Sequence, residues 1–568
     1  MAVDYTEAFP KRSTTRPHAR VYSDTSAVTG SASSSNKTLM LVGNAEGGKP
    51  NTVYRLTNMV QARNILRSGD LVDAMELAWN PAMTNVSAGE ILAVRAQEAT
   101  NATLKQGGLE FESLIYGDEA NSINIELDDN AFGEKRLKVS LNGEDTIYDG
   151  LGTIFTVEYN GESPYASVEI TGTEGQAKQL ILSSGEDAET AVEVNFSLGD
   201  KGVYVNAFDL ANAISSVDGF DVTMGFTGDK NIATKGLDPI SETVITKEEP
   251  VKVTGLYADI ENQLAFSNLV SVKVVNPGTA LENFGPVNLT GGSNGTTPSS
   301  WADKFTQLAN EGGYYLVPLT DSQAIHAEAR HFVTERTNEG EPMRAIVGGK
   351  YDEQPNEAMA RASVLKSDRV SYVGFSGKRI MSDGRQLEIP GYLMAAQVAG
   401  YTSAVDLGES IMFKPFALTE LSTVHDANTM DSLNTSGVIM AGFNRNQEVT
   451  NFRIDEDLTT YRDPSNPIKN TNSAGEAHDF LVSELRNRLE ENFIGTKNSM
   501  LSPSIIKTDI ISFLDQKVRD NEIQDYDAED IQVVINGNVA SVTFTVYPIM
   551  SLRKVDASIV YKMQTISA

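Results

Sequence analysis

The chain changes its hydrophobic pattern twice along its length, and this change constrains the fold more than any other feature. In residues 38–96 and 301–455, short apolar runs alternate with stretches in which apolar residues recur every three or four positions. In residues 97–285, apolar residues mostly occupy alternate positions, and an Asn-Gly pair at 142–143 separates two such runs. The first pattern predicts strands alternating with helices in a parallel sheet, and the second predicts antiparallel hairpins. We therefore predict an α/β sheet domain that is interrupted by a mostly-β insertion.

These patterns predict a multidomain chain of the α/β and α+β classes, in agreement with a rough prior of about 150 residues per domain. The predicted segments are an extended N-terminal arm at 1–37, the first part of the sheet domain at 38–96, the β-rich insertion at 97–285, a linker at 286–300, the second part of the sheet domain at 301–460, and a small α+β domain at 461–568.

The C-terminal α+β domain has the clearest local signals. Ser473 and Glu476 have the spacing of a capping box, which predicts the start of a helix that stops at Gly495. Ser502 and the proline that follows it predict the start of a second helix. An Asn-Gly-Asn sequence at 536–538 predicts a hairpin between two strands.

Two stretches near the chain ends have strand-like composition without an obvious partner. One is Arg20, Val21 and Tyr22, which lie in an otherwise polar arm. The other is a strictly alternating run at 555–563 that includes Ile559, Tyr561 and Met563. A strand with a free edge pairs through its backbone with whatever strand is supplied. The last strand therefore pairs either within its own domain or with a neighbouring chain.

Composition excludes several classes of function. The formal net charge of −31 argues against direct binding of nucleic acid, which requires clustered Lys and Arg. No run of about 18 apolar residues is present, so we expect no membrane span, and the first residues do not have the layout of a signal peptide. The absence of Cys favours assembly in a reducing cytoplasm.

No motif for catalysis, cofactor binding or metal binding is convincing. The stretch from Gly43 to Lys49 is similar to a phosphate-binding loop, but Pro50 stands where that loop needs Ser or Thr. His326 and His331 are five residues apart, not the four that place two ligands on one helix face. We predict no enzyme activity, no cofactor and no metal, although a pair of carboxylates for glycoside hydrolysis stays open.

Several runs in the C-terminal half are similar to the tail sheath proteins of contractile-tailed phages, particularly those that infect Gram-positive bacteria. The runs are GVIMAGFNR at 437–445, FRIDEDLTTY at 452–461 and FLVSELR at 480–486. The apolar strand at 41–43 after a polar arm and the closing strands at 531–563 also fit. The resemblance covers about 38–96 and 300–568. Related sheaths occur in type VI secretion systems and R-type bacteriocins, so the choice between a phage and another contractile injection system stays open.

The resemblance implies a structural subunit of the virion that assembles in the host cytoplasm. Such subunits form hexameric rings that stack helically around a tail tube, and the sheath contracts to drive the tube through the host envelope. The implied partners are further copies of the chain, the tail tube protein, and the baseplate and tail terminator proteins. The implied strand exchange between subunits uses the arm, with Arg20, Val21 and Tyr22, and the last strand, with Ile559, Tyr561 and Met563.

The resemblance also leads us to expect that the C-terminal domain contacts the tube through a helix within 476–520. Basic residues there stand out in an acidic chain, although they equally fit a solvated helix face; they are Arg486, Arg488, Lys507, Lys517 and Arg519. The alternative function is a surface or virion adhesin with β-rich binding domains, which the β-rich middle of the chain suggests.

Overall fold

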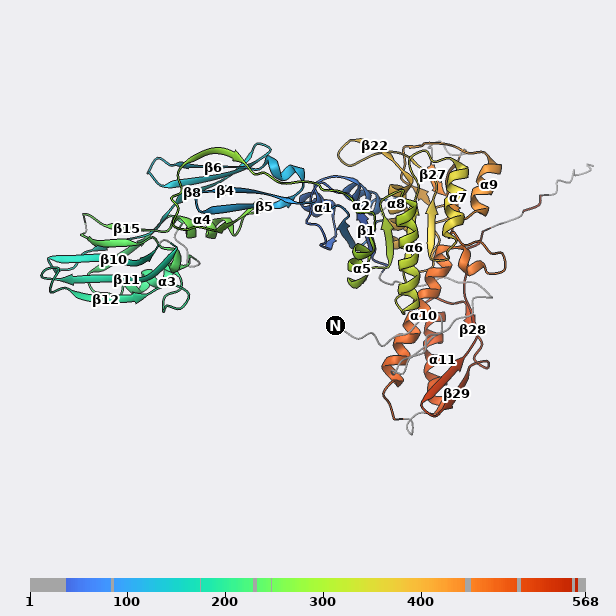
Figure 1. Cartoon of the computed structure of the whole chain (residues 1–568). Helices are drawn as coiled ribbons and strands as arrows, with labels where there is room; N and C mark the ends of the chain where they lie inside the picture. Colours follow the sequence, from blue (N-terminus) through green and yellow to red (C-terminus); the bar gives the residue numbers. More distant parts are fainter. Residues whose placement is uncertain are drawn as a thin grey trace, which may run out of the picture. The chain divides into compact units, whose positions relative to one another are not determined.

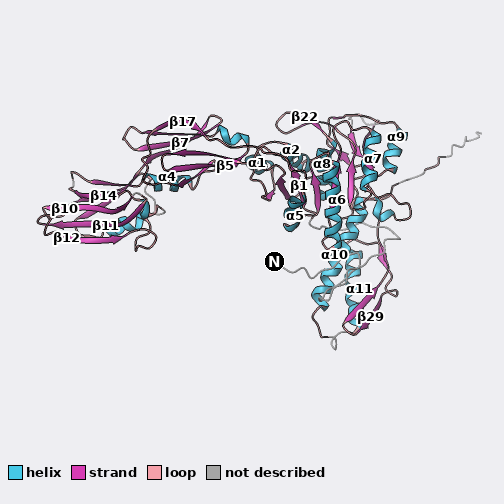
Figure 2. Cartoon of the chain, in the orientation of Figure 1, coloured by secondary structure: helices cyan, strands magenta, loops and turns pink. Residues whose placement is uncertain are grey.

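The computed structural model (Figures 1 and 2) describes residues 37–82, 86–173, 175–227, 232–246, 248–444, 451–497, 502–553 and 557–559. These residues form two compact units. Unit 1 contains the described residues up to Ala45, those from Asn51 to Gln97, and those from Thr297 onward. Unit 2 contains residues 46–50 and 98–296. A mixed α/β, multidomain architecture is thus confirmed.

Unit 1 is built on a seven-stranded sheet whose strands come from both sides of unit 2 in the sequence. In spatial order the strands are β2 (Tyr54–Leu56), β3 (Ile91–Arg95), β1 (Leu39–Gly43), β18 (Tyr315–Pro318), β19 (Arg344–Gly348), β20 (Val370–Val373) and β25 (Val438–Ile439). All neighbouring pairs are parallel except β2 with β3. Every residue of the five central strands is buried, which is why these strands are continuous apolar runs in the sequence.

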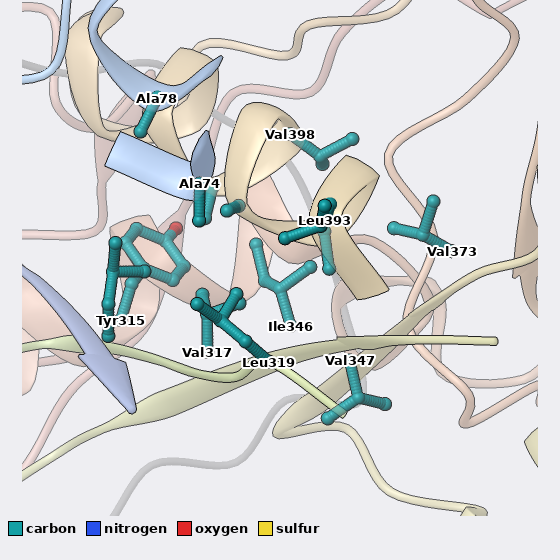
Figure 3. Packing of buried hydrophobic residues seen from close by; sticks show 14 of the residues in the cluster. Ala74, Ala78, Tyr315, Val317, Leu319, Ile346, Val347, Val373, Leu393 and Val398 are labelled. Carbon is teal, nitrogen blue, oxygen red and sulfur yellow. The ribbon is translucent and has the colours of Figure 1, made fainter. Parts of the chain in front are cut away.

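Two groups of helices cover this sheet. The first group is α1 (Met59–Leu66), α2 (Asp70–Trp79) and α8 (Gly391–Ala404), and the second is α5 (Ala302–Asn310), α6 (Gln323–Asn338), α7 (Pro355–Leu365) and α9 (Ala427–Thr435). Figure 3 shows Leu393 and Val398 of α8 above Ile346 of β19, with Ala74 of α2 close by. Helix α8 is buried along most of its length, which explains its mostly apolar sequence.

Two small sheets complete this part of unit 1. One contains β22 (Gln386–Ile389), β21 (Gly377–Ile380) and β24 (Glu420–Leu421), and the other contains β23 (Pro415–Phe416), β27 (Asn451–Ile454) and β26 (Ala441–Asn444). A short 3-10 helix, η3 (Pro467–Asn470), precedes the C-terminal helices.

Unit 2 is mostly antiparallel β-structure with two hydrophobic cores. One core lies among β9 (Thr153–Tyr159), β10 (Tyr165–Thr173), β11 (Gln176–Gly185), β12 (Val192–Ser197), α3 (Ala207–Ile214), β13 (Phe220–Met224), η2 (Thr234–Gly236), β14 (Ile240–Val244) and β15 (Val251–Thr254). The other lies among β4 (Asn101–Gln106), β5 (Leu109–Tyr116), η1 (Asp118–Ser122), β6 (Asn124–Asp129), β7 (Lys135–Leu141), β8 (Glu144–Leu151), α4 (Leu256–Leu264), β16 (Val270–Val274) and β17 (Phe284–Asn288).

The structure differs from the sequence prediction at residues 286–300, which were predicted to be a linker. Strand β17 runs through the start of this stretch and pairs with β6. Farther on, Thr290 and Ser293 form bridges with Thr103 and Thr100. The Gly, Ser and Pro content that suggested a linker is therefore compatible with an edge strand and its turns.

The C-terminal part of unit 1 is a pair of helices packed on short hairpins (Figure 1). The elements are α10 (Asn472–Phe493), α11 (Pro503–Arg519), β28 (Asp525–Tyr526), β29 (Gln532–Asn536), β30 (Val539–Thr543) and β31 (Val546–Tyr547). Leu485, Ile510 and Leu514 are buried between them. Within the described residues, no helix combines the length and the apolar character that crossing a membrane requires.

Candidate functional site

Helix α10 joins the C-terminal helix pair to the sheet of unit 1, and two buried carboxylates mark the junction. Glu476 and Asp479 are one turn apart on α10, so their side chains project from the same face. Both are almost completely buried, at 1% and 2% exposure. A buried carboxylate is stable only when it is paired and hydrogen-bonded, so the surroundings of these two residues define the junction.

Glu476 binds the start of the described chain. Its Oε1 accepts a hydrogen bond from Nζ of Lys37 at 2.9 Å, and its Oε2 accepts one from the hydroxyl of Tyr315 in β18. Lys37 also donates to the carbonyl oxygen of Thr402 at 2.8 Å, near the end of α8. Burial raises the pKa of Glu476, and Lys37 opposes this effect. Lys37 therefore connects the root of the N-terminal arm with α8 and α10.

Asp479 binds two arginines from the sheet. Arg344 Nε donates to Asp479 at 2.8 Å, Arg369 donates to its other oxygen, and the hydroxyl of Tyr314 lies 2.9 Å away. Burial alone raises the pKa of Asp479, but Arg344 and Arg369 outweigh it, so the pKa is lowered overall. A Cβ atom at Gly475 would lie 2.1 Å from the Arg344 guanidinium, so a larger residue here would displace the guanidinium from its present position beside Asp479.

The ionic cluster formed by Lys37, Arg344, Arg369, Glu476 and Asp479 is closed and fully paired. Its ionic groups contact one another, the two tyrosines and backbone oxygens. Desolvation raises the pKa of the Tyr315 hydroxyl well above its usual value. We interpret the ionic cluster as a structural joint between α10 and the sheet, because its charges are paired with one another and all of its side chains except Arg369 are almost completely buried.

The capping box predicted at Ser473 and Glu476 is wrong. Helix α10 begins at Asn472 with Thr471 as the N-cap, and the Thr471 side chain makes no capping hydrogen bond. Instead, Asp457 accepts a hydrogen bond from the backbone N–H of Ser473 at 3.0 Å. Glu476 points into the ionic cluster, where pairing with Lys37 and Tyr315 replaces the local cap.

The five basic residues predicted for a partner contact do not form a free basic surface. Arg486 is buried and donates to the backbone oxygen of Gly340. Lys517 is buried between Glu484 and Glu522.

The other three basic residues lie closer to the surface. Arg488 makes a bidentate ion pair with Asp509, with both N···O distances at 2.9 Å. Lys507 donates to the backbone oxygen of Ile531 at 2.9 Å, and Arg519 is exposed. Four of the five charges are therefore engaged inside the subunit, because α10, α11 and the hairpins supply acceptors that the sequence pattern does not reveal.

Most residues predicted for strand exchange lie outside the described residues. Arg20, Val21, Tyr22, Tyr561 and Met563 belong to this group. Ile559 is described, is 74% exposed and is not in a strand. The strand-exchange assignment therefore stays a prediction.

The loop from Gly43 to Pro50 lacks the geometry of a phosphate site. The next helix, α1, begins at Met59, so no helix N-terminus follows the loop directly. A Cβ at Gly43 would lie 2.6 Å from the side chain of Leu319, which occupies the space beside the strand end.

The two histidines on α6 have different environments. His326 is buried, its Nε2 lies 2.7 Å from the carbonyl oxygen of Thr320, and desolvation lowers its pKa to about 4. His331 is exposed. Among the residues that the structure describes, no group of three His, Asp or Glu side chains is arranged to hold a metal ion.

Sequence reasoning missed the ionic cluster, although one signal was available. Arg344 interrupts the apolar start of a buried strand, and Asp479 lies on the same face of α10 as Glu476 and Arg486, which are also buried. Charged residues at such positions indicate buried pairs, but the sequence does not identify the partners, which are 110 and 135 residues from Asp479.

Comparisons with known proteins show which proteins this chain is similar to. No family model matches the chain. A protein of Enterococcus phage phiEF24C assigned as a tail sheath protein is 50% identical over 569 residues, covering 99% of this chain and 100% of that protein. The tail sheath protein of Staphylococcus phage Twort is 41% identical, with the same coverage. The similarity extends across the insertion, which corrects the expectation that it would stop there.

The fold also matches a solved structure. The sheath tail protein DSY3957 from Desulfitobacterium hafniense superposes with a TM-score of 0.54 over 91% of this chain and 94% of that chain. Its sequence identity is 12%, so this match concerns the fold alone.

Proposed function

The chain belongs to the tail sheath protein family of bacteriophages, and from this we propose that it forms stacked hexameric rings around a tail tube and contracts to drive the tube through the host envelope. Family membership makes it a virion component, and we propose assembly in the host cytoplasm. The observation that carries the proposal is the 50% identity over 99% of the chain. Because the relatives share unit 2 as well, an adhesin is not needed to explain the β-rich insertion.

The joint in unit 1 supports a role in a polymer that moves. The root of the arm, at Lys37, and the first turn of α10, at Glu476, share one buried ion pair at 2.9 Å. Force applied to the arm by a neighbouring subunit would therefore pass directly into α10 and the sheet. A rigid subunit with exchanged terminal strands allows large movements between subunits without loss of their connections.

Besides further copies of itself, the proposed partners are the tail tube, the baseplate and the tail terminator proteins. The helix pair of α10 and α11 is the surface we propose for the tube. Its basis is the family resemblance and not free positive charge, since Arg486, Arg488, Lys507 and Lys517 are engaged internally.

Contraction is expected to need neither nucleotide nor metal. Stored energy would come from a difference between two packings of the same subunits, and a few kcal/mol per subunit adds up over a polymer. Purified tails exposed to mild denaturant in the presence of a chelator and without nucleotide should shorten, as measured by electron microscopy. Tails that shorten only after ATP or a divalent metal is added would contradict this mechanism and reopen an enzymatic role.

Unit 2 is expected to lie on the outside of the polymer. It contains 33 Asp and Glu residues but only 12 Lys and Arg residues, so it carries −21 of the formal net charge of −31. Close packing of such units around a tube would be opposed by charge repulsion, whereas an outer position keeps them hydrated. Its two cores are separate from the sheet core of unit 1, so its removal should spare that core.

The corresponding experiment replaces residues 98–296 with a short Gly-Ser linker. The two ends of the removed segment lie close together, because the backbone N–H of Glu98 donates to the carbonyl oxygen of Thr296 at 3.1 Å, so a short linker can join Gln97 to Thr297. Cylinders of reduced outer diameter should still form. A folded variant that no longer polymerises would place unit 2 at an essential contact.

A further inference from the structure

Residues 549–553 lie against the body of unit 1 without forming a strand or a helix. A hollow of about 20 Å³ separates part of this segment from its surroundings, and its lining includes Gly408, Met412, Glu456, Asp457 and Ala474. A hollow of this volume accommodates about one water molecule. This region is therefore too small to be a ligand pocket. We call the surface of unit 1 that residues 549–553 contact, around Gly408, Glu456 and Ala474, the seat of the segment.

Arg553 attaches the segment to this seat. Its Nε lies 2.5 Å from Oε1 of Glu456, and its Nη2 donates to Oε2 at 2.8 Å. The Glu456 side chain is 7% exposed and also accepts a hydrogen bond from Asn434 at 2.8 Å. A hydrogen bond between two charged groups is stronger than one between neutral groups, and a buried carboxylate without a cation is unfavourable. Arg553 supplies the cation that contacts Glu456 directly, from 97 residues away, and Arg462 adds a second positive charge nearby.

The rest of the segment is held less firmly. Ile549 and Met550 are half-buried, whereas Leu552 is 76% exposed. The Arg553 side chain is itself 38% exposed, so water can reach the outer side of its ion pair. Because side chains and not a strand ladder hold the segment, it can leave the seat without disrupting a sheet.

We propose that Arg553 and Glu456 form a latch that holds the C-terminal segment on its own subunit and delays its pairing with a neighbour. The latch rests on the proposed function, in which residues beyond it pair with another subunit. Its release would free residues 548–553 beyond β31 and extend the reach of the tail by about 20 Å. The free subunit would thus be held back from premature polymerisation.

The attachment is tested first in the monomer. The chain contains no Cys, so a spin label at Leu552→Cys reports on this segment alone. Adding Arg553→Ala should convert a restricted spectrum into a mobile one, and Arg330→Ala, which removes an exposed arginine on α6, should not. An unchanged spectrum after Arg553→Ala would overturn the latch.

The consequence is tested on the unlabelled chain by light scattering, with electron microscopy to identify the product. Arg553→Ala and Glu456→Gln should each shorten the lag before polymerisation several-fold, and Arg330→Ala should leave it unchanged. The exchanged pair Arg553→Glu with Glu456→Arg should restore much of the lag.

A lag that is unchanged or longer in Arg553→Ala would overturn the latch, because the seat would then be neutral or part of the assembled contacts. Failure of the unmodified chain to polymerise would instead contradict the proposed function. The label spectrum would then still decide whether Arg553 holds the segment.

Discussion

Replacing Asp479 with alanine is expected to lower the free energy of unfolding of unit 1 by about 3–5 kcal/mol, the range found when one partner of a buried ion pair is removed. The substitution leaves Arg344, which is 2% exposed, and Arg369 without their shared carboxylate. Two cations would then remain at the junction between α10 and the sheet, and the helix pair should separate from the sheet more readily.

Denaturant unfolding, monitored by tryptophan fluorescence, measures this loss of stability in unit 1. The two tryptophans, Trp79 and Trp301, both lie in the core of unit 1, so unit 2 does not contribute to the signal. The matched control is Asp509→Ala, which removes the partly exposed pair with Arg488 and should cost about 1 kcal/mol or less. If Asp479→Ala and Asp509→Ala lower the free energy of unfolding by the same amount, the ionic cluster does not hold α10 to the sheet.

The contribution of Asp479 to stability should depend on pH. Since the pKa of Asp479 is lowered in the folded state, its contribution is present above the unfolded value of about 3.9 and is lost as pH falls through the folded value. The stability difference between the unmodified chain and Asp479→Asn should therefore be large at neutral pH and shrink at pH values below about 4.

Deleting residues 1–36 is expected to abolish polymerisation while leaving a folded monomer. Lys37, the first described residue, stays in place with its 2.9 Å contact to Glu476, so the root of the arm and the joint are preserved. Loss of polymer would then reflect loss of the contacts that the arm makes with neighbouring subunits. Unchanged tryptophan unfolding is the control for folding, and normal polymerisation of the deletion variant would show that the arm has another role.

The sequence predicted regular elements well where periodicity was strong. The apolar runs at 39–43 and 91–94 correspond to β1 and β3, and the helix-like patterns beginning near Met59 and Leu71 correspond to α1 and α2. These predictions succeeded because the hydrophobic period reports directly on which faces are buried.

The predictions that failed concern polar residues whose partners are distant in the sequence. Glu476 was assigned to a local cap, but it pairs with Lys37, which is 439 residues away. Arg486 and Lys517 were expected either at a tube contact or on a solvated helix face; they are buried and bind acceptors within unit 1, which excludes the solvated face, and the tube contact stays a prediction. Local pattern indicates that a position is polar, whereas only the tertiary structure determines whether its charge is free.

The central claim, that this chain is the subunit of a hollow sheath, is tested most directly by electron microscopy of the purified full-length protein. The account predicts long hollow cylinders with stacked rings for the full-length chain and discrete particles for the chain that lacks residues 1–36. Discrete particles from the full-length chain, under conditions where tryptophan fluorescence shows unit 1 to be folded, would contradict it.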